Sequence, residues 1–245
     1  MKTRMSRFSL SILLLIVSAY INAESIINER VGYARDLVSD ELLYSEWHFE
    51  EFQGDKILSD KVIYKNADGE TIAIKTVNYK YDPMMPDFSL DNFSTGHKER
   101  VARNGEELLV EFVKNEQADM QSKSIPLPGD AIIDAGFDQF VIQHWDELIA
   151  GERLVKKLLV PSMKKFIDFR IYQKKVDEEN NKRILHIEPN NMVFRMLSRV
   201  TQLEYDIDRP VLLQFKGTSN MRDASGKNLQ VRIDFPRQEQ IARKE

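Results

Sequence analysis

Apolar and polar residues alternate with a period of two through most of residues 33–111, and this alternation predicts β-strands. In the run around Trp47, that residue and Phe49 share one face, and His48 lies on the other. We expect the aromatic face to be buried and His48 to face solvent. An Asp-Gly pair at residues 68–69 separates two further runs and indicates a hairpin turn.

Residues 134–150 instead place their apolar side chains three and four positions apart, which predicts an amphipathic helix. Asp134 is the expected N-cap, and Gly151 is the expected end of the helix. The apolar stripe needs a sheet face or the mouth of a barrel to cover it. The large aromatic members of the stripe are Phe137, Phe140 and Trp145.

Strand patterns return after the helix and end in two alternating runs near residues 211–215 and 229–235. About ten strands and one principal helix predict a mainly β, α+β protein. The expected architecture is a curved antiparallel sheet or half-open β-barrel that wraps the helix. We expect residues 24–245 to form a single β-rich domain. The alternative is two packed β subdomains joined near residues 116–130, a polar stretch that we expect to be a connector.

The first 23 residues have the three parts of a secretory signal peptide. A basic start precedes an apolar run at residues 8–20, and Ala23 is the small residue at the expected cleavage site. The apolar run is shorter than the roughly 20 residues that a membrane-spanning helix needs. We therefore expect cleavage after Ala23 and a chain that does not span a membrane afterwards. An uncleaved anchor is the alternative.

Charge and cysteine content narrow the possible partners and compartments. Residues 1–23 carry three basic and no acidic residues, so their removal leaves 32 basic against 39 acidic residues, a net charge of −7. Lysine and arginine are interspersed with acids rather than gathered into a stripe, so we expect no nucleic-acid partner. The chain contains no cysteine, which excludes a lipid-anchored lipoprotein. An exported chain without disulfides favours the bacterial periplasm, with secretion as the other option.

The sequence contains no diagnostic catalytic or metal-binding motif. Its four histidines lie on four different predicted elements, without the clustered ligands of a zinc site. Neither a Gly-x-Ser-x-Gly elbow nor a phosphate-binding glycine loop occurs. We therefore expect no catalytic residues, no metal and no cofactor. The least favoured interpretation is a hydrolase assembled from distant residues, for which the candidates are His48, Glu50 and Ser219.

The remaining candidate site is apolar. Its aromatic residues either fill a solid core or line a cavity for an acyl chain or another hydrophobic ligand. Those residues are Trp47, Phe49, Phe137, Phe140, Trp145 and Phe169. In the proline-flanked loop at residues 82–86, Met84 and Met85 are candidates for a lid over the mouth of that cavity, with a tight loop as the alternative.

Three stretches of the chain carry a resemblance to known sequences. They are the helix from Gly136 to Trp145, the Leu-Val-Pro-Ser step at residues 159–162, and the Gly-Thr-Ser-Asn turn at residues 217–220. Together they resemble a group of uncharacterised exported proteins of proteobacteria, which has no assigned activity. The predicted architecture is also similar to that of periplasmic lipoprotein carriers, which hold acyl chains. The first resemblance implies export, and the second implies an acyl-binding concavity.

Two interpretations of function follow from these observations. In the first, a non-enzymatic exported protein binds a lipid or another apolar small molecule inside a half-barrel. In the alternative, a cell-envelope interaction or scaffold module has a solid core. It would contact a protein partner through an exposed strand edge or through residues 82–86. Lipid that copurifies with the protein would distinguish the first from the second.

Overall fold

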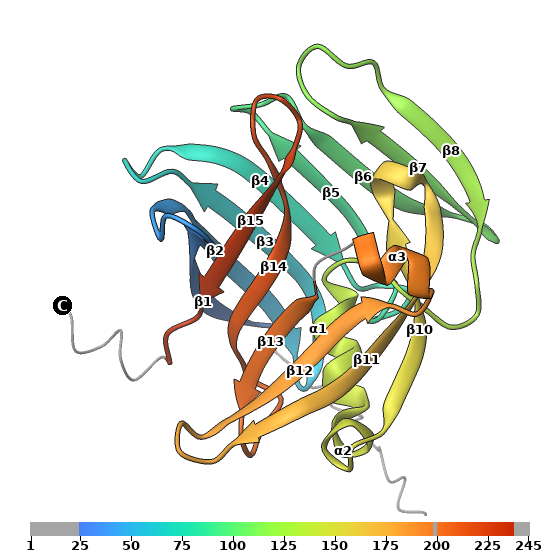
Figure 1. Ribbon diagram of the computed structural model, residues 1–245. Coiled ribbons are helices and arrows are strands. Elements are labelled where there is room, and N and C mark those ends of the chain that lie inside the picture. Colours follow the sequence, from blue (N-terminus) through green and yellow to red (C-terminus); the bar gives the residue numbers. More distant parts are fainter. Residues whose placement is uncertain (1–24, 198–199, 238–245) are drawn as a thin grey trace, which may run out of the picture.

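The computed structural model describes residues 25–197 and 200–237 (Figure 1). The expected signal peptide at residues 1–23 and its cleavage site lie outside these described residues. Within them, the chain forms 15 strands in one sheet and a few short helices. The protein is therefore mainly β, as the sequence predicts.

The sheet consists of two meanders that meet where the first strand pairs with the last. Its order is β8-β7-β6-β5-β4-β3-β2-β1-β15-β14-β13-β12-β11-β10-β9, and neighbours are antiparallel except for the parallel pair β9 and β10. The strands are β1 (Ile26–Asp36), β2 (Leu42–Gln53), β3 (Lys56–Lys65), β4 (Thr71–Asn78), β5 (Asp87–Asn92), β6 (Lys98–Asn104), β7 (Glu107–Val113), β8 (Gln121–Pro126), β9 (Ala131–Ile132), β10 (Arg153–Val160), β11 (Lys165–Asp177), β12 (Lys182–Pro189), β13 (Thr201–Asp206), β14 (Leu212–Arg222) and β15 (Asn228–Asp234).

The sheet is strongly curved but open. β8 and β9 are its two edges, and the described strands include no pair that joins them. The 3₁₀ turn η1 (Pro161–Met163), which follows β10, contacts β6 and β7 from the other end of the sheet. Curvature thus brings the two ends of the sheet together around a shared interior (Figure 1).

The structure contains more strands than the sequence pattern predicts. β8 lies inside residues 116–130, which we expected to be a connector. Of its six residues, Ile125 alone is buried, because β8 is an edge strand that pairs on one side with β7. Such a strand tolerates polar residues on both faces, so it lacks the alternation that identifies a half-buried strand. The sheet continues from the first meander into the second, which does not match the two-subdomain alternative.

The expected helix at residues 134–150 is divided into α1 (Gly136–Gln143) and α2 (Trp145–Ile149). The break lies at His144, whose φ of −108° and ψ of 22° are not helical. Asp134 is not the N-cap, because its φ is 46° and its carboxylate pairs with Lys75 instead. A further helix, α3 (Met192–Leu197), occupies a segment whose pattern fits either a helical turn or a strand. None of the helices in the described residues is long and apolar enough to cross a membrane.

The start of α1 is fixed against the loop at residues 82–86. The backbone N–H of Ile133 donates a 2.9 Å hydrogen bond to the carbonyl oxygen of Met84. Gly136 lies so close to the same carbonyl that a Cβ atom would overlap it. Glycine is required here because the backbones of the loop and the helix touch.

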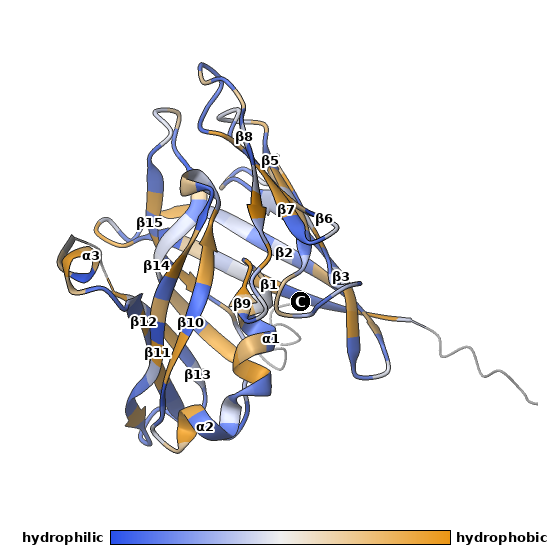
Figure 2. Cartoon of the chain, turned by 90° about the vertical axis from the view of Figure 1, so that its right-hand side faces the viewer, coloured by the Kyte–Doolittle hydropathy of each residue, from blue (hydrophilic) through white to orange (hydrophobic). Residues whose placement is uncertain are grey.

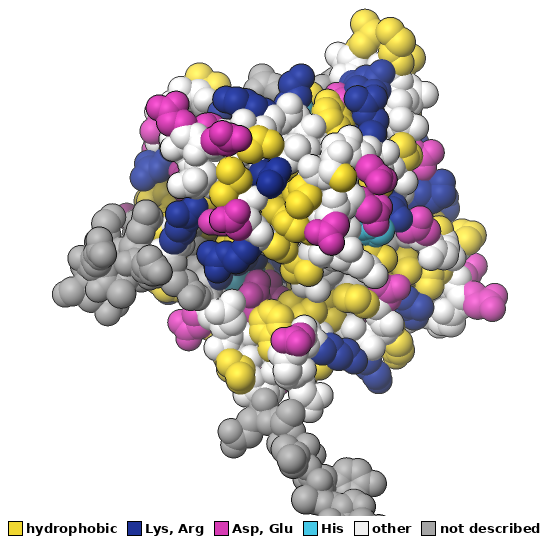
Figure 3. All heavy atoms as spheres, turned by 90° about the horizontal axis from the view of Figure 1, so that it is seen from below, with side chains coloured by type: hydrophobic (Ala, Val, Ile, Leu, Met, Phe, Trp, Pro, Cys, Tyr) yellow, Lys and Arg dark blue, Asp and Glu magenta, His cyan; other side chains and the backbone are white. Residues whose placement is uncertain are grey.

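Three clusters of buried side chains form the core on the inner face of the sheet. One cluster joins residues of β3 to β10, a second joins β1 to β5 with β14 and β15, and a third joins α1 and α2 to β11, β12 and β13. Figure 2 shows apolar and polar residues alternating along the strands and an apolar stripe on α1. Seen from below, the molecule presents apolar side chains interspersed with acidic and basic ones (Figure 3). The space between the clusters is where the candidate site lies.

Candidate functional site

A pocket of about 390 Å³ opens on the inner face of the curved sheet. One wall is apolar and comes from α1 and from the strands β10 to β15. Its apolar side chains include Phe137, Leu158, Phe169, Ile187, Leu203 and Phe215. The charged lining residues, called the charged wall below, are Arg30, Glu46, His48 and Lys75 on the strands, with Asp134 just before α1 and Asp138 on it. The pocket therefore offers both an apolar and a charged lining to a ligand.

Strand register builds the charged wall from four neighbouring strands. Arg30 on β1 lies opposite His48 on β2, and Glu46 on β2 lies opposite Tyr64 on β3. Lys75 on β4 lies opposite Val62, which is on the same face of β3 as Tyr64. Because alternate residues of a strand share a face, this register brings the charged groups together on the inner side of the sheet.

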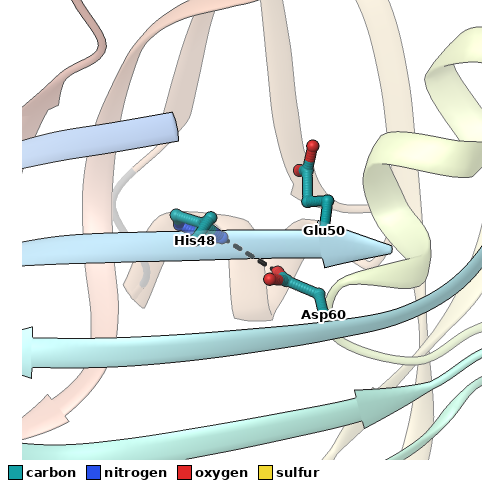
Figure 4. Close-up of side chains that lie close together, drawn as sticks. All are labelled: His48, Glu50 and Asp60. Carbon is teal, nitrogen blue, oxygen red and sulfur yellow. Dashed lines mark hydrogen bonds and ion pairs between the residues drawn. The ribbon is translucent and has the colours of Figure 1, made fainter. Parts of the chain in front are cut away.

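His48 is held between the carboxylates of Asp60 and Glu46, and Figure 4 shows its contact with Asp60. Its Nδ1 lies 2.9 Å from Oδ2 of Asp60, and its Nε2 lies 3.4 Å from Oε1 of Glu46. Burial alone would lower the pKa of His48, but the hydrogen bonds with Asp60 and Glu46 outweigh this effect and raise the pKa to about 9. The imidazole is consequently protonated at neutral pH and acts as a buried cation.

Arg30 and Lys75 supply the other two cations of the wall. Arg30 lies 3.2 Å from a carboxylate oxygen of Glu50 and 3.5 Å from one of Asp138. Lys75 is 7% exposed and forms an ion pair with Asp134. Burial would lower the pKa of Lys75, but the charge of Asp134 and its hydrogen bond raise it above the ordinary value. Lys75 therefore stays charged inside the protein.

The six aromatic residues expected to line a cavity occupy three different environments. Phe137 and Phe169 line the pocket. Phe140 is 0% exposed and belongs with Trp145 to the core cluster that α1 and α2 share with β11, β12 and β13. Trp47 and Phe49 lie on the opposite face of β2 from His48, where Lys65 lies over the Trp47 ring at 4.9 Å. The expected orientation of β2 is thus reversed, because the acids and His48 on its inner face find charged partners there.

The loop proposed as a lid is part of the core. Met85 is 7% exposed and packs in the cluster of β3 to β10, and Met84 packs beside the cluster that contains α1. The backbone of the loop is tied to α1 through Ile133. The two methionines therefore stabilise the position of α1 and are not a free cover over the pocket. Pro83 in the same loop is exposed, so contact with a protein partner through this loop stays a prediction.

The residues considered for hydrolysis do not form a nucleophile and base. The Ser219 hydroxyl lies 2.8 Å from the hydroxyl of Tyr44, whereas His48 pairs with Asp60 and Glu46. His48, Glu50 and Asp60 do offer ligand atoms within 4.8 Å of one another, a spacing that fits a metal ion. However, Glu50 is turned away from the other two side chains (Figure 4) and pairs with Arg30.

Sequence reasoning missed most of the charged wall, although two signals for it exist. Ala73, Lys75 and Val77 share a strand face that is otherwise apolar, so Lys75 is a charged residue at a core position. Glu46, His48 and Glu50 likewise share one face of β2. A charged residue on a buried face indicates a partner of opposite charge elsewhere in the fold, because an unpaired buried charge is costly.

Comparisons with known proteins leave the family open. No family model and no curated protein matches the chain. Among solved structures, the chain is similar to a beta-barrel-like protein with a domain of unknown function, DUF1849, from Brucella abortus. The TM-score is 0.41 at 8% identity, over 86% of this chain and 97% of that chain.

Proposed function

We propose that this chain is an exported periplasmic protein that holds a small amphiphilic molecule without transforming it. The observation that carries the proposal is a pocket lined by both apolar and charged side chains. Its volume of about 390 Å³ falls within the range of small-molecule sites, roughly 300 to 1,000 Å³. The periplasmic location rests on the signal-peptide pattern of residues 1–23.

The mixed lining of the pocket favours an amphiphile over a purely apolar ligand. Phe137 and Phe169 would bury a hydrocarbon group, which stabilises binding by about 0.8 kcal/mol for each buried CH₂. A ligand without a polar group would displace water from Arg30, His48 and Glu46 and offer these charged groups no hydrogen bond in return. A ligand with both kinds of surface satisfies both walls.

The first test is native mass spectrometry of the protein purified from periplasm, followed by organic extraction and lipid analysis. A stoichiometric amphiphile is the expected result. A bare protein mass, together with failure to bind the neutral dye N-phenyl-1-naphthylamine, would refute the proposal. That outcome would favour an envelope scaffold with an unoccupied interior.

Three variants link dye binding to this pocket. Phe137→Asp places a charge on the apolar wall, and Ala135→Trp fills space in the pocket. Both should weaken dye binding about tenfold or more, because a charge or a bulky ring opposes burial of the dye. Phe49→Asp is the matched control, since Phe49 is also partly buried but lies on the outer face of β2. Equal binding by all three folded variants would contradict the assignment.

A further inference from the structure

The cations of the charged wall and the carboxylates that they contact form a cluster with more acid than base. Among the residues that the structure describes, the three cations contact five carboxylates. Glu46, Asp134 and Asp138 line the pocket and balance the three cations when His48 is protonated, whereas Glu50 and Asp60 lie outside the lining and add two negative charges. A surplus of charge in a largely buried cluster costs free energy unless a group of opposite charge compensates it.

The pKa values of two buried tyrosines are raised by burial and by the carboxylates of this cluster. Burial raises the pKa of Tyr64 well above its ordinary value, and the charges of Glu46 and Asp134 raise it further. The pKa of Tyr79 is also raised by burial and then by nearby carboxylates, of which Asp60 has the largest effect. The carboxylates thus add to the effect of burial on the pKa values of both tyrosines.

Two side chains on the wall retain hydrogen-bonding capacity toward the pocket. Glu46 is 7% exposed, and its contact with His48 is a long one of 3.4 Å. Tyr64 is 3% exposed, and its hydroxyl has no hydrogen-bond partner among the described residues. The two residues lie opposite each other on β2 and β3, and both line the pocket. They offer one anionic and one neutral acceptor to the same ligand group.

We propose that the ligand of this pocket is a cationic amphiphile. Its ammonium group donates hydrogen bonds to the Glu46 carboxylate and the Tyr64 hydroxyl oxygen, while its hydrocarbon part lies along Phe137 and Phe169. This inference rests on the proposed function and names the charge of the ligand. A fatty acid would instead bring a further negative charge to a cluster that already has a surplus of acid.

The contacts of the wall favour an organic cation over a metal ion. Both ring nitrogens of His48 face carboxylates, so the ring must lose its proton before it can bind a metal. The two oxygens of Glu50 accept hydrogen bonds from Arg30 and Asn28. A metal ion bound by His48, Glu50 and Asp60 would have to break these contacts. An ammonium group at Glu46 would replace only the 3.4 Å contact between His48 and Glu46.

The experiment compares three ligands that share a twelve-carbon chain and differ in the charge of the head group. Dodecylammonium, dodecanoate and dodecyl maltoside are titrated below their micellar concentrations against the protein loaded with N-phenyl-1-naphthylamine. Dodecylammonium is expected to bind at least about tenfold more tightly than dodecanoate. Glu46→Gln, which keeps the shape of the side chain, should lower dodecylammonium affinity about tenfold and leave dodecyl maltoside unchanged. Glu51→Gln is the control, because Glu51 pairs with Ser59 outside the pocket.

The outcomes separate this inference from the proposed function. Dodecanoate or dodecyl maltoside binding more tightly than dodecylammonium would overturn the cationic preference while leaving an amphiphile binder in place. Failure of all three to displace the dye would overturn both proposals. Stoichiometric Zn²⁺ binding that excludes dodecylammonium would assign the surplus acid to a metal ion and also overturn the inference. An equal loss of dodecylammonium affinity in Glu46→Gln and Glu51→Gln would refute the role of Glu46.

Discussion

Replacing His48 with glutamine is expected to remove a defined pH dependence from the free energy of unfolding. The pKa of His48 rises from the ordinary 6.5 to about 9 in the folded protein. Between these values the folded protein keeps a proton that the unfolded chain has released. The stabilisation is therefore complete below about pH 6.5 and is lost as the pH rises through about 9.

The magnitude follows from the two pKa values. At about 1.4 kcal/mol per pH unit, the interval from 6.5 to about 9 corresponds to about 3 kcal/mol of stability. His48 has a side-chain exposure of 13%, so solvent screens its two carboxylate contacts little. The ion pairs of Arg30 and Lys75 stay in place in the variant, so the effect belongs to one imidazole.

The assay is urea denaturation of the wild type and of His48→Gln at several pH values between about 6 and 9.5. The stability difference between the two proteins should be largest at the acidic end and shrink by about 3 kcal/mol toward the alkaline end. The other histidines are present in both proteins, so their titration cancels in the difference. Parallel stability profiles across this interval would refute the reasoning and show that His48 is not a buried cation.

Two further substitutions test packing around the pocket by the same denaturation measurement. Gly136→Ala should lower the free energy of unfolding by more than about 2 kcal/mol, because its Cβ would overlap the Met84 carbonyl. Gly129→Ala, whose Cβ meets open space, should change it by no more than about 0.5 kcal/mol. Similar losses in both variants would contradict the close contact at Gly136. Tyr44→Phe should cost about 1 kcal/mol because the hydrogen bond with Ser219 is lost, and an unchanged unfolding midpoint would show that this bond adds nothing.

The outcome for β2 shows where alternation alone stops being informative. The sequence identifies correctly which residues of this strand share a face, because side chains of a strand alternate with a period of two. It does not reveal which face is inside. Hydrophobicity favours the face of Trp47 and Phe49, yet the face of Glu46 and His48 lines the pocket. Arg30 on β1, Asp60 on β3 and Lys75 on β4 provide the charged surroundings that make this polar face the inner one.

The helical segment gives a similar contrast. Spacing of apolar residues locates α1 and α2 within a few residues, because one helix face must be buried whatever covers it. The same spacing does not indicate that Asp134 leaves the helix to pair with Lys75, a residue about sixty positions away in the chain. An aspartate can serve either as an N-cap or as the partner in a buried ion pair. Asp134 takes the second role because the fold places Lys75 of β4 beside it.

The sequence by itself determined the mainly β class, the positions of most strands, the site of the helices and the pairs of residues that share a face. These features depend on local periodicity and turn chemistry, which each segment carries alone. The tertiary structure decided the 15-strand order, the inward direction of the charged face and the pocket between the two meanders. Those features depend on register between distant strands, since a buried charge is stable where another strand supplies its partner.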